Sequence, residues 1–190
     1  MTMLLRNFED APVCYPTWVE RKYDGIRCVI VVRDGVGVGM SREGHVIAAA
    51  DGIAQIMAAA CGDGVYDGEL DGGSWGATQS AVKRNDGRNL CYRAWDALTL
   101  DEWAAGRSER SLSQRKARLV GLLKPEFRGG RCGIVKGQRA ANEYMLGGMF
   151  MDAVSRSWEG VVIKDPSAPY LVGQRSGAWQ KLKPGKKAEW

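Results

Sequence analysis

The feature that most constrains the fold is a run of β-branched residues followed at once by a turn. Residues 26–33, IRCVIVVR, are rich in Val and Ile and predict a strand. Asp34 and Gly35 come next, a residue pair strongly favoured in two-residue hairpin turns, and VGVGMS follows at 36–41. The segment therefore predicts an antiparallel hairpin.

Other segments extend this pattern. Further strands are expected at 65–71, 89–98, 160–164 and 178–184, and helices at 48–62, 111–126 and 138–157. In the last strand, alternation puts Trp179, Lys181 and Lys183 on one face. The sequence contains no glycine-rich strand-to-helix loop of the dinucleotide or P-loop type. Short, hairpin-linked strands of this kind favour an α+β fold, in which helices flank antiparallel β-sheets.

Composition narrows the class of protein. A length of 190 residues suits one well-buried domain, and 45% hydrophobic with 26% charged residues is ordinary for a globular chain. No apolar run has the length of a membrane span, and the N-terminus lacks the apolar core of a signal peptide, so we expect a cytoplasmic protein that does not bind membranes. Five cysteines without a CxxC pair, and a single histidine, argue against zinc and favour reduced structural thiols.

Positive charge is concentrated toward the C-terminus. Between Lys164 and Lys187, six cations stand against one anion, Asp165, while the whole chain has a net charge of +5. Such a block indicates a phosphate-rich partner, although a solvated tail would have the same composition.

A charged cluster stands next to the first predicted strand, where Lys22 and Asp24 precede it and Arg27 lies just inside it. A deprotonated lysine is a nucleophile, and neighbouring cations such as Lys181 and Lys183 favour that state. Carboxylates suit metal ions or ribose hydroxyls, lysines suit phosphate oxygens, and aromatic rings suit nucleobases. Together these residues predict nucleotide chemistry with an amine nucleophile.

KYDGIR at 22–27 resembles the K-x-D-G-x-R signature of the covalent nucleotidyltransferases, which include ATP-dependent DNA ligases, RNA ligases and mRNA capping enzymes. Five more elements follow in the family's order: SREG (41–44), DGEL (67–70), YRAWD (92–96), EGVVIK (159–164) and WQKLK (179–183). Residues 159–184 most resemble the short DNA ligases of bacteriophages. The resemblance implies the ATP-grasp-like nucleotidyltransferase fold of ligases and capping enzymes, with an adenylation domain over residues 1–190.

The resemblance also implies the chemistry. Lys22 would attack the α-phosphate of ATP to form lysyl-AMP, and the AMP would pass to the 5′-phosphate of a nick in double-stranded DNA before sealing. Lys164, Lys181 and Lys183 would hold the α-phosphate and support charge in the transition state. Such sealing would serve DNA replication, repair and recombination.

Further residues receive binding roles from the same resemblance. The implied assignments are Glu20 to the adenine amino group, Arg27 to the ribose or terminal phosphates, Glu69 to the ribose, Glu159 with Glu69 to Mg²⁺, and Arg42 to the 5′-phosphate of the nick. Tyr92 would stack on adenine, with Val161 or a neighbour as the opposite wall. Trp95 is the alternative stacking ring, and either aromatic residue could instead belong to the core.

The sequence departs from the family at its end. Relatives carry an OB-fold domain after the K-x-K element, whereas this sequence continues for only seven residues after Lys183. We therefore expect no OB domain here, so that the chain is a fragment, a degenerate copy, or the partner of a second polypeptide. Only 21 residues precede Lys22, which favours ATP over NAD as the donor. An RNA ligase, a capping guanylyltransferase and a nick-binding module with poor turnover are the alternatives.

Overall fold

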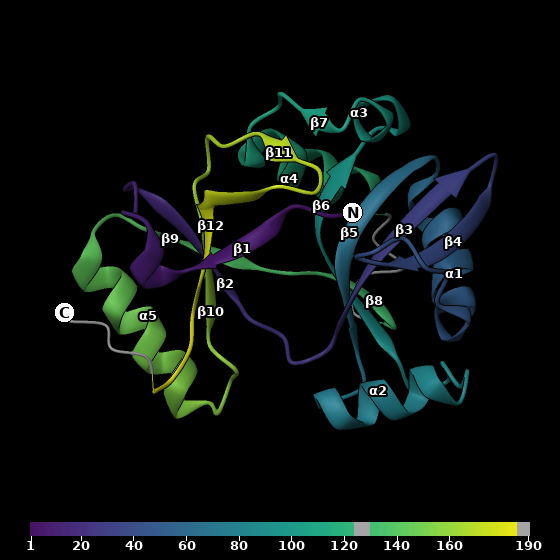
Figure 1. Ribbon diagram of the computed structural model, residues 1–190, viewed down its shortest axis with the longest axis horizontal. Coiled ribbons are helices and arrows are strands. Elements are labelled where there is room, and N and C mark those ends of the chain that lie inside the picture. The colour runs from purple at the N-terminus through teal and green to yellow at the C-terminus, as the bar shows by residue number, and fades with distance from the viewer. Residues whose placement is uncertain (124–129, 186–190) are drawn as a thin grey trace.

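A computed structural model of the protein describes residues 1–123 and 130–185. Two five-stranded sheets lie side by side (Figure 1). The first, here called the terminal sheet, has the strand order β1 (Leu4–Asn7), β12 (Arg175–Leu182), β10 (Val161–Lys164), β2 (Thr17–Arg21), β9 (Gly137–Ala140). The second, here called the hairpin sheet, has the order β4 (Val36–Ser41), β3 (Ile26–Arg33), β5 (Gly64–Asp71), β6 (Cys91–Leu98), β8 (Cys132–Ile134).

Most neighbouring strands are antiparallel, and helices cover the outer sides, so the predicted α+β class is confirmed. Two pairs, β1 with β12 and β6 with β8, are parallel. A short ribbon of β7 (Arg107–Ser108) and β11 (Tyr170–Leu171) accompanies the two sheets. The chain passes from β2 in one sheet to β3 in the other over residues 22–25, which places the predicted nucleophile at the junction of the sheets (Figure 1).

The β3–β4 hairpin forms as predicted. Asp34 and Gly35 have φ values of 51° and 75°, so both turn residues are left-handed, as a type I′ turn requires. Strand β3 is buried on both faces: Ile30 and Val32 belong to the core that contains α1, and Val29 packs with Trp179 on the other side. Burial on both faces explains why this segment is a continuous apolar run rather than an alternating one.

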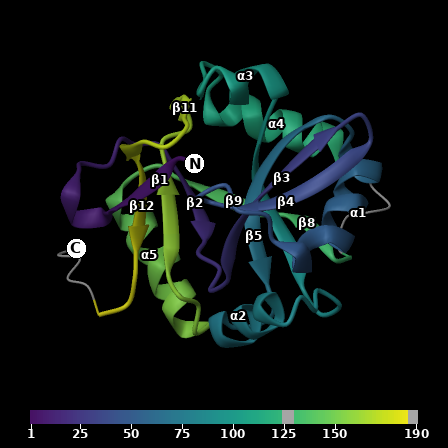
Figure 2. The same ribbon diagram turned by 45° about the vertical axis from the view of Figure 1, so that its right-hand side comes forward.

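Helices cover the sheets from outside. Helix α1 (Asp51–Cys61) packs on the hairpin sheet, and α5 (Glu143–Ser155) packs on the terminal sheet, at opposite sides of the molecule (Figure 1, Figure 2). Helices α2 (Trp75–Lys83), α3 (Leu100–Ala104) and α4 (Leu112–Leu122) complete the fold. Ser111 caps α4 by accepting the Gln114 backbone N–H, and the Gln114 side chain accepts in return.

The sequence prediction was wrong in one region. Residues 138–157 were expected to be a helix, but 137–140 form strand β9, which pairs with β2 at the sheet edge, and the helix begins only after Asn142, its N-cap. Ala140 is buried in the cluster that contains Val19, so pairing with β2 and burial override helix propensity. The last residues of the expected helix at 111–126 lie outside the described residues. Within the described part, no helix is long and apolar enough to cross a membrane.

Candidate active site

A cavity of about 500 Å³ lies between the two sheets and receives most of the predicted site residues. Its lining includes Glu20, Lys22, Arg27, Arg42, Glu69, Trp95, Val162, Lys164, Trp179, Lys181 and Lys183. These residues come from β2, β3, β5, β6, β10, β12 and the adjoining loops, which explains why the motifs are widely separated in sequence. We call this cavity the nucleotide pocket.

Lys22 follows the last residue of β2 and points into an ionic cluster. Its Nζ donates to Oε2 of Glu159 at 2.6 Å, and Oε1 of the same carboxylate accepts from Lys183 at 2.5 Å. Burial alone would raise the pKa of Glu159, but hydrogen bonds from Lys183 and Lys22 outweigh it and hold the pKa below its usual value. Glu159 is therefore ionised and links the predicted nucleophile to the K-x-K element.

Lysine ammonium groups are unusually dense in this pocket. Burial, together with the neighbouring charges of Lys183 and Lys22, lowers the pKa of Lys181. Lys164 is 2% exposed, and its burial lowers its pKa to about 8 even though Glu20 opposes that change. A cavity with this excess of cations suits a polyphosphate, whose oxygens would replace the water removed from the lysines.

Local contacts explain why KYDGIR has an aspartate at position 24 and a glycine at position 25. A Cβ atom at Gly25 would lie 2.0 Å from the carbonyl oxygen of Leu70 and 2.8 Å from Cγ of Glu69, so only glycine lets the chain pass this close to β5. Asp24 accepts a hydrogen bond from the backbone N–H of Trp75 at 3.3 Å, in the first turn of α2. The motif thus fixes the loop that carries Lys22 against the hairpin sheet.

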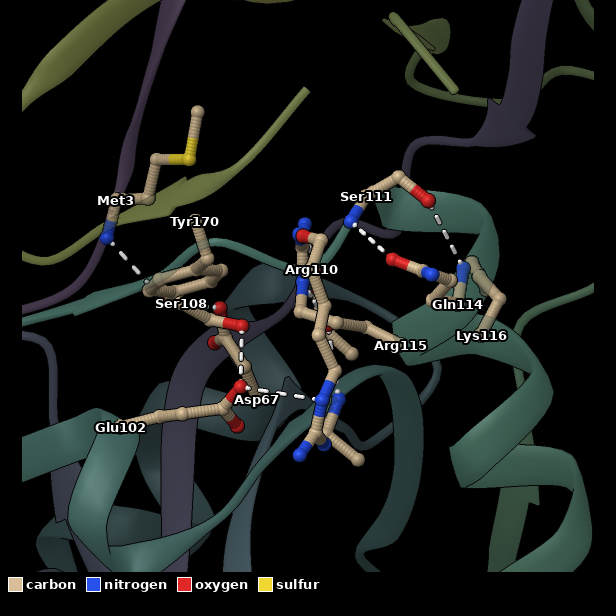
Figure 3. Close-up of polar contacts among 12 residues, drawn as sticks. Met3, Asp67, Glu102, Ser108, Arg110, Ser111, Gln114, Arg115, Lys116 and Tyr170 are labelled. Carbon is tan, nitrogen blue, oxygen red and sulfur yellow. Dashed lines mark hydrogen bonds and ion pairs between the residues drawn. The ribbon is translucent and has the colours of Figure 1, made fainter. Parts of the chain in front are cut away.

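Arg27 lies in the pocket wall, where it is held by a buried carboxylate. Its guanidinium makes two hydrogen bonds to Asp67. Burial alone would lower the pKa of Arg27, but the attraction of Asp67 outweighs burial and raises it. The Tyr170 hydroxyl donates to Asp67 at 2.7 Å and accepts the backbone N–H of Met3 at 3.3 Å (Figure 3). The orientation of Arg27 is therefore set by Asp67 of β5 and Tyr170 of β11, and Met3, just before β1, holds Tyr170.

Glu69 lies directly opposite Arg27 in the β3–β5 register. Burial raises its pKa from 4.5 to about 7, because the attraction of Lys22 and Arg27 does not fully offset desolvation and the nearby charges of Asp67 and Glu159. Among residues 1–123 and 130–185, no hydrogen bond to the Glu69 carboxylate is present. This carboxylate is open to a ligand.

The prediction that Tyr92 stacks on a nucleobase was wrong. Tyr92 is fully buried on the core face of β6, and its hydroxyl donates to the carbonyl oxygens of Tyr66 at 2.7 Å and Cys28 at 3.1 Å. Its ring occupies the space over Gly68, where a Cβ atom would lie 2.6 Å from Tyr92 Cζ. Strand alternation turns the Trp95 side chain to the opposite face of β6 from Tyr92. Trp95 is also the extra residue of a bulge in the β5–β6 ladder, because its neighbours Ala94 and Asp96 pair with Gly68 and Asp67.

Trp95, the alternative named from the sequence, lines the nucleotide pocket. The Lys164 ammonium lies 5.3 Å and the Arg27 guanidinium 5.0 Å from the centre of its ring. The opposite wall also differs from the first assignment: Val161 packs into the core beside α5, and its neighbour Val162 lines the pocket. In both corrections, the residue that lines the pocket lies an odd number of positions from the residue first assigned. Alternation along a strand puts two such residues on opposite faces.

Glu20 and Arg42 lie at opposite extremes of exposure. Glu20 is 3% exposed, and its two oxygens are bound by Lys164, Lys116 and the Trp18 indole. Arg42 stands at the end of β4, is well exposed and forms an ion pair with Glu43. The acidic group therefore lies deep in the lining, and the exposed Arg42 cation, paired with Glu43, lies at its mouth.

Several residues that shape this site were missed from the sequence. Asp67 and Tyr170 hold Arg27, and Lys116 holds Glu20. Asp96, the last residue of YRAWD, forms a fully buried ion pair with Arg115, with distances of 2.8 and 3.1 Å. Arg115 and Lys116 are adjacent on α4 (Figure 3). Two consecutive cations on a helix do not by themselves indicate that both side chains are directed into the protein, as they are here.

Known proteins resemble this chain over most of its length. The family model described as ATP dependent DNA ligase domain matches residues 10–183. A probable DNA ligase of Kineococcus radiotolerans is 34% identical over 127 residues, which cover 63% of this chain and 24% of that protein. DNA ligase 4 of Emericella nidulans is 27% identical over 220 residues, which cover 97% of this chain and 21% of that protein. The chain thus spans about a quarter of the length of these curated relatives.

Solved structures show the same fold. The Chlorella virus DNA ligase-adenylate matches with a TM-score of 0.73 and 21% identity, over 96% of this chain and 66% of that one. The ATP-dependent DNA ligase of bacteriophage T7 in complex with ATP matches with a TM-score of 0.71 and 19% identity, over 89% of this chain and 62% of that one. With the six sequence elements gathered at one pocket and a family model matching residues 10–183, the chain belongs to the family of ATP-dependent DNA ligase domains.

Proposed function

We propose that this chain is the adenylation domain of an ATP-dependent DNA ligase. The observation that carries the proposal is the position of Lys22, whose Nζ lies in a cation-rich pocket beside the ionised Glu159 and Lys183. In the first step, the Lys22 amine would lose a proton and form a bond to the α-phosphorus of ATP. The bond from that phosphorus to the bridging oxygen would break, and pyrophosphate would leave.

Lys181 on β12 and Lys183 just after it continue the strand face of Trp179 and line the pocket, and the phosphates of ATP would bind at this end. Their charges would meet the oxygens of the α-phosphate, on which negative charge builds up during the attack. Lys183 is already held by Glu159, which also binds Lys22, so the nucleophile and the charge-stabilising cation are kept next to each other. This arrangement supplies the proximity that an in-line displacement needs.

The nucleoside would occupy the inner part of the pocket. Trp95 offers its ring face to adenine, Val162 forms the opposing wall, and Glu20 would accept a hydrogen bond from the adenine amino group. Glu69, with its free carboxylate and raised pKa, would bind a ribose hydroxyl. The resemblance assigned Lys164 to the α-phosphate. Because its ammonium binds Glu20 at 2.7 Å and lies near the Trp95 ring, we instead place Lys164 at this base-binding end.

We propose that a divalent metal ion would be held by two carboxylates at this pocket, Glu69 in its lining and Glu159 beside it. Glu159 is an ionised carboxylate, and Glu69 is close enough for the Glu159 charge to raise its pKa. Mg²⁺ is commonly bound by one or two carboxylates together with substrate phosphates, which is what this pair could provide. When bound, the ion would neutralise charge on the pyrophosphate leaving group.

The nucleic acid would approach the mouth of the pocket. Arg42 is exposed there, and the Trp75 side chain, which also lines the mouth, is half exposed. We propose that Arg42 binds the 5′-phosphate of a nick in double-stranded DNA. That phosphate would attack the phosphorus of lysyl-AMP and release Lys22, after which the 3′-hydroxyl would displace AMP and seal the strand.

The test uses a nicked duplex labelled at its 5′-phosphate, with ATP or GTP, and a denaturing gel that separates the adenylated and the sealed strand. We expect both products with ATP, and neither with Lys22→Ala. The same variant should still seal a nick that already carries 5′-AMP, because the step that needs Lys22 is bypassed. Lys83→Ala, on the exposed end of α2, is the matched control.

Sealing from ATP by Lys22→Ala would contradict the assigned nucleophile. A product formed with GTP and not with ATP would favour a capping-type enzyme, and activity restricted to nicked RNA would favour an RNA ligase.

A further inference from the structure

Among the described residues that were predicted to bind the nucleotide, Glu20 has the carboxylate with the most side-chain donors. Oε1 accepts from the Trp18 indole at 3.1 Å and pairs with the Lys116 ammonium, and Oε2 accepts from Lys164 at 2.7 Å. A carboxylate has about four lone-pair positions, so three donors leave one acceptor position. Glu20 lines the nucleotide pocket and pairs in register with Val162, the proposed wall for the base.

Lys116 reaches this carboxylate from outside the pocket. It lies on α4 (Figure 3). It is not part of the pocket lining, and it belongs to none of the six family elements. Its Nζ also donates to the carbonyl oxygen of Val135 at 3.2 Å, and its side chain is 12% exposed. The ammonium is therefore held between a backbone carbonyl and the Glu20 carboxylate, outside the residues that line the nucleotide pocket.

Two cations on one buried carboxylate have a chemical consequence. Burial alone would raise the pKa of Glu20, but Lys164 and Lys116 outweigh it and keep the pKa below its usual value. An ionised carboxylate accepts hydrogen bonds and donates none. At the base edge it would accept from an exocyclic amino group, as in adenine, and repel a carbonyl oxygen at the same position, as in guanine.

We propose that Lys116 is a positioning residue for base selection, which holds Glu20 as an ionised acceptor so that the pocket takes a 6-amino purine and rejects a 6-oxo purine. The inference rests on the proposed function, because it concerns the nucleotide that this pocket binds. Lys164 cannot fill this role alone, since it lines the pocket and its charge is shared with the rings of Trp95 and Trp179 at 5.3 and 4.2 Å.

Without Lys116, Glu20 would keep one cation and gain a second open lone-pair position. Loss of one of the two opposing cations would shift the pKa of Glu20 upward, toward the protonated acid, which donates a hydrogen bond and tolerates a carbonyl oxygen. The expected result is a change in preference rather than a general loss of binding. We expect the ratio of ATP to GTP affinity to fall by about tenfold or more in Lys116→Met, because unpaired buried polar groups are what make such sites selective.

The experiment measures binding of the α,β-methylene analogues of ATP and GTP to the full chain by calorimetry, so that no covalent step is needed. The variants are Lys116→Met, Lys116→Gln, which keeps a donor for Val135, Lys116→Arg, which keeps the charge, and Lys83→Met as an exposed control. Thermal melting of each variant reports whether the fold is intact. Lys116→Arg should restore most of the selectivity, and Lys83→Met should leave it unchanged.

A double-mutant cycle with Glu20→Gln separates positioning from a structural role. If Lys116 acts through Glu20, its removal in the Glu20→Gln background should not change the ATP to GTP ratio further. An equal weakening of both analogues in Lys116→Met and Lys116→Gln, or a wild-type ratio in both, would overturn the inference. A wild-type chain that binds neither analogue would overturn the proposed function itself, and one that binds both equally would overturn base selection by Glu20 and Lys116 while leaving the pocket assignment.

Discussion

Tyr92 and Trp95 are three positions apart on β6, and replacing each in turn separates base stacking from core packing. Trp95→Leu keeps an apolar side chain at the pocket wall but removes the ring. Tyr92→Phe keeps the ring in the core but removes the hydroxyl that donates to Cys28 and Tyr66. The two changes should affect different properties of the protein.

The expected magnitudes follow from these contacts. Stacking of a base on an aromatic side chain contributes about 1–3 kcal/mol, so Trp95→Leu should weaken ATP binding by about 5- to 150-fold. The Tyr92 hydroxyl makes hydrogen bonds of 2.7 and 3.1 Å, and its loss should cost about 0.5–1.5 kcal/mol. For a chain of this length, that corresponds to a decrease in Tm of about 1–6 °C, with no change in ATP affinity.

Calorimetric titration with α,β-methylene-ATP and thermal melting of the two variants measure these quantities side by side. Weaker ATP binding by Tyr92→Phe than by Trp95→Leu would refute the assignment of Trp95 as the stacking ring. A Tm for Tyr92→Phe equal to that of the wild type would refute the structural role of its hydroxyl.

Three further results are expected. Arg115→Met leaves the buried Asp96 carboxylate uncompensated and should lower the free energy of unfolding in denaturant by about 3–5 kcal/mol; adding Asp96→Asn should recover part of this loss, and a change below about 1 kcal/mol would contradict the account. Burial raises the pKa of Glu69 from 4.5 to about 7, so the stability of the free protein should fall as pH rises between these two values, and it should fall less in Glu69→Gln; an equal or steeper fall in the variant would contradict that sign. Affinity for nicked duplex should decrease steeply between about 50 and 200 mM salt, and Arg42→Ala should reduce the salt slope by about one; an unchanged slope would exclude Arg42 from the phosphate contacts.

The fold could be predicted where the local signals are strong. The hairpin around Asp34 and Gly35 follows from turn chemistry, and α4 follows from the Ser111 cap. Strand β9 could not be predicted, because its pairing with the distant β2 and the burial of Ala140 decide its conformation. The parallel pairing of β1 with β12 likewise joins segments from the two ends of the sequence.

The site was predictable as far as its motifs, and less so where side-chain direction matters. Residues that directly follow strands, such as Lys22 after β2 and Lys183 after β12, lie in the pocket as expected. Tyr92 and Val161 were assigned from the family resemblance, whereas strand alternation and, for Tyr92, a nearby bulge decide which face they occupy. Lys116 carries no motif, and only the packing of α4 brings its charge to Glu20.

The most direct test of the central claim is to map the covalent nucleotide on the protein. After incubation with ATP and Mg²⁺, intact-mass analysis should show addition of one AMP, and peptide mapping should place it on Lys22, in acid-labile linkage through Nζ. The adduct should be absent from Lys22→Ala and present in Lys83→Ala. An adduct on another residue, or one that persists in Lys22→Ala, would contradict the account.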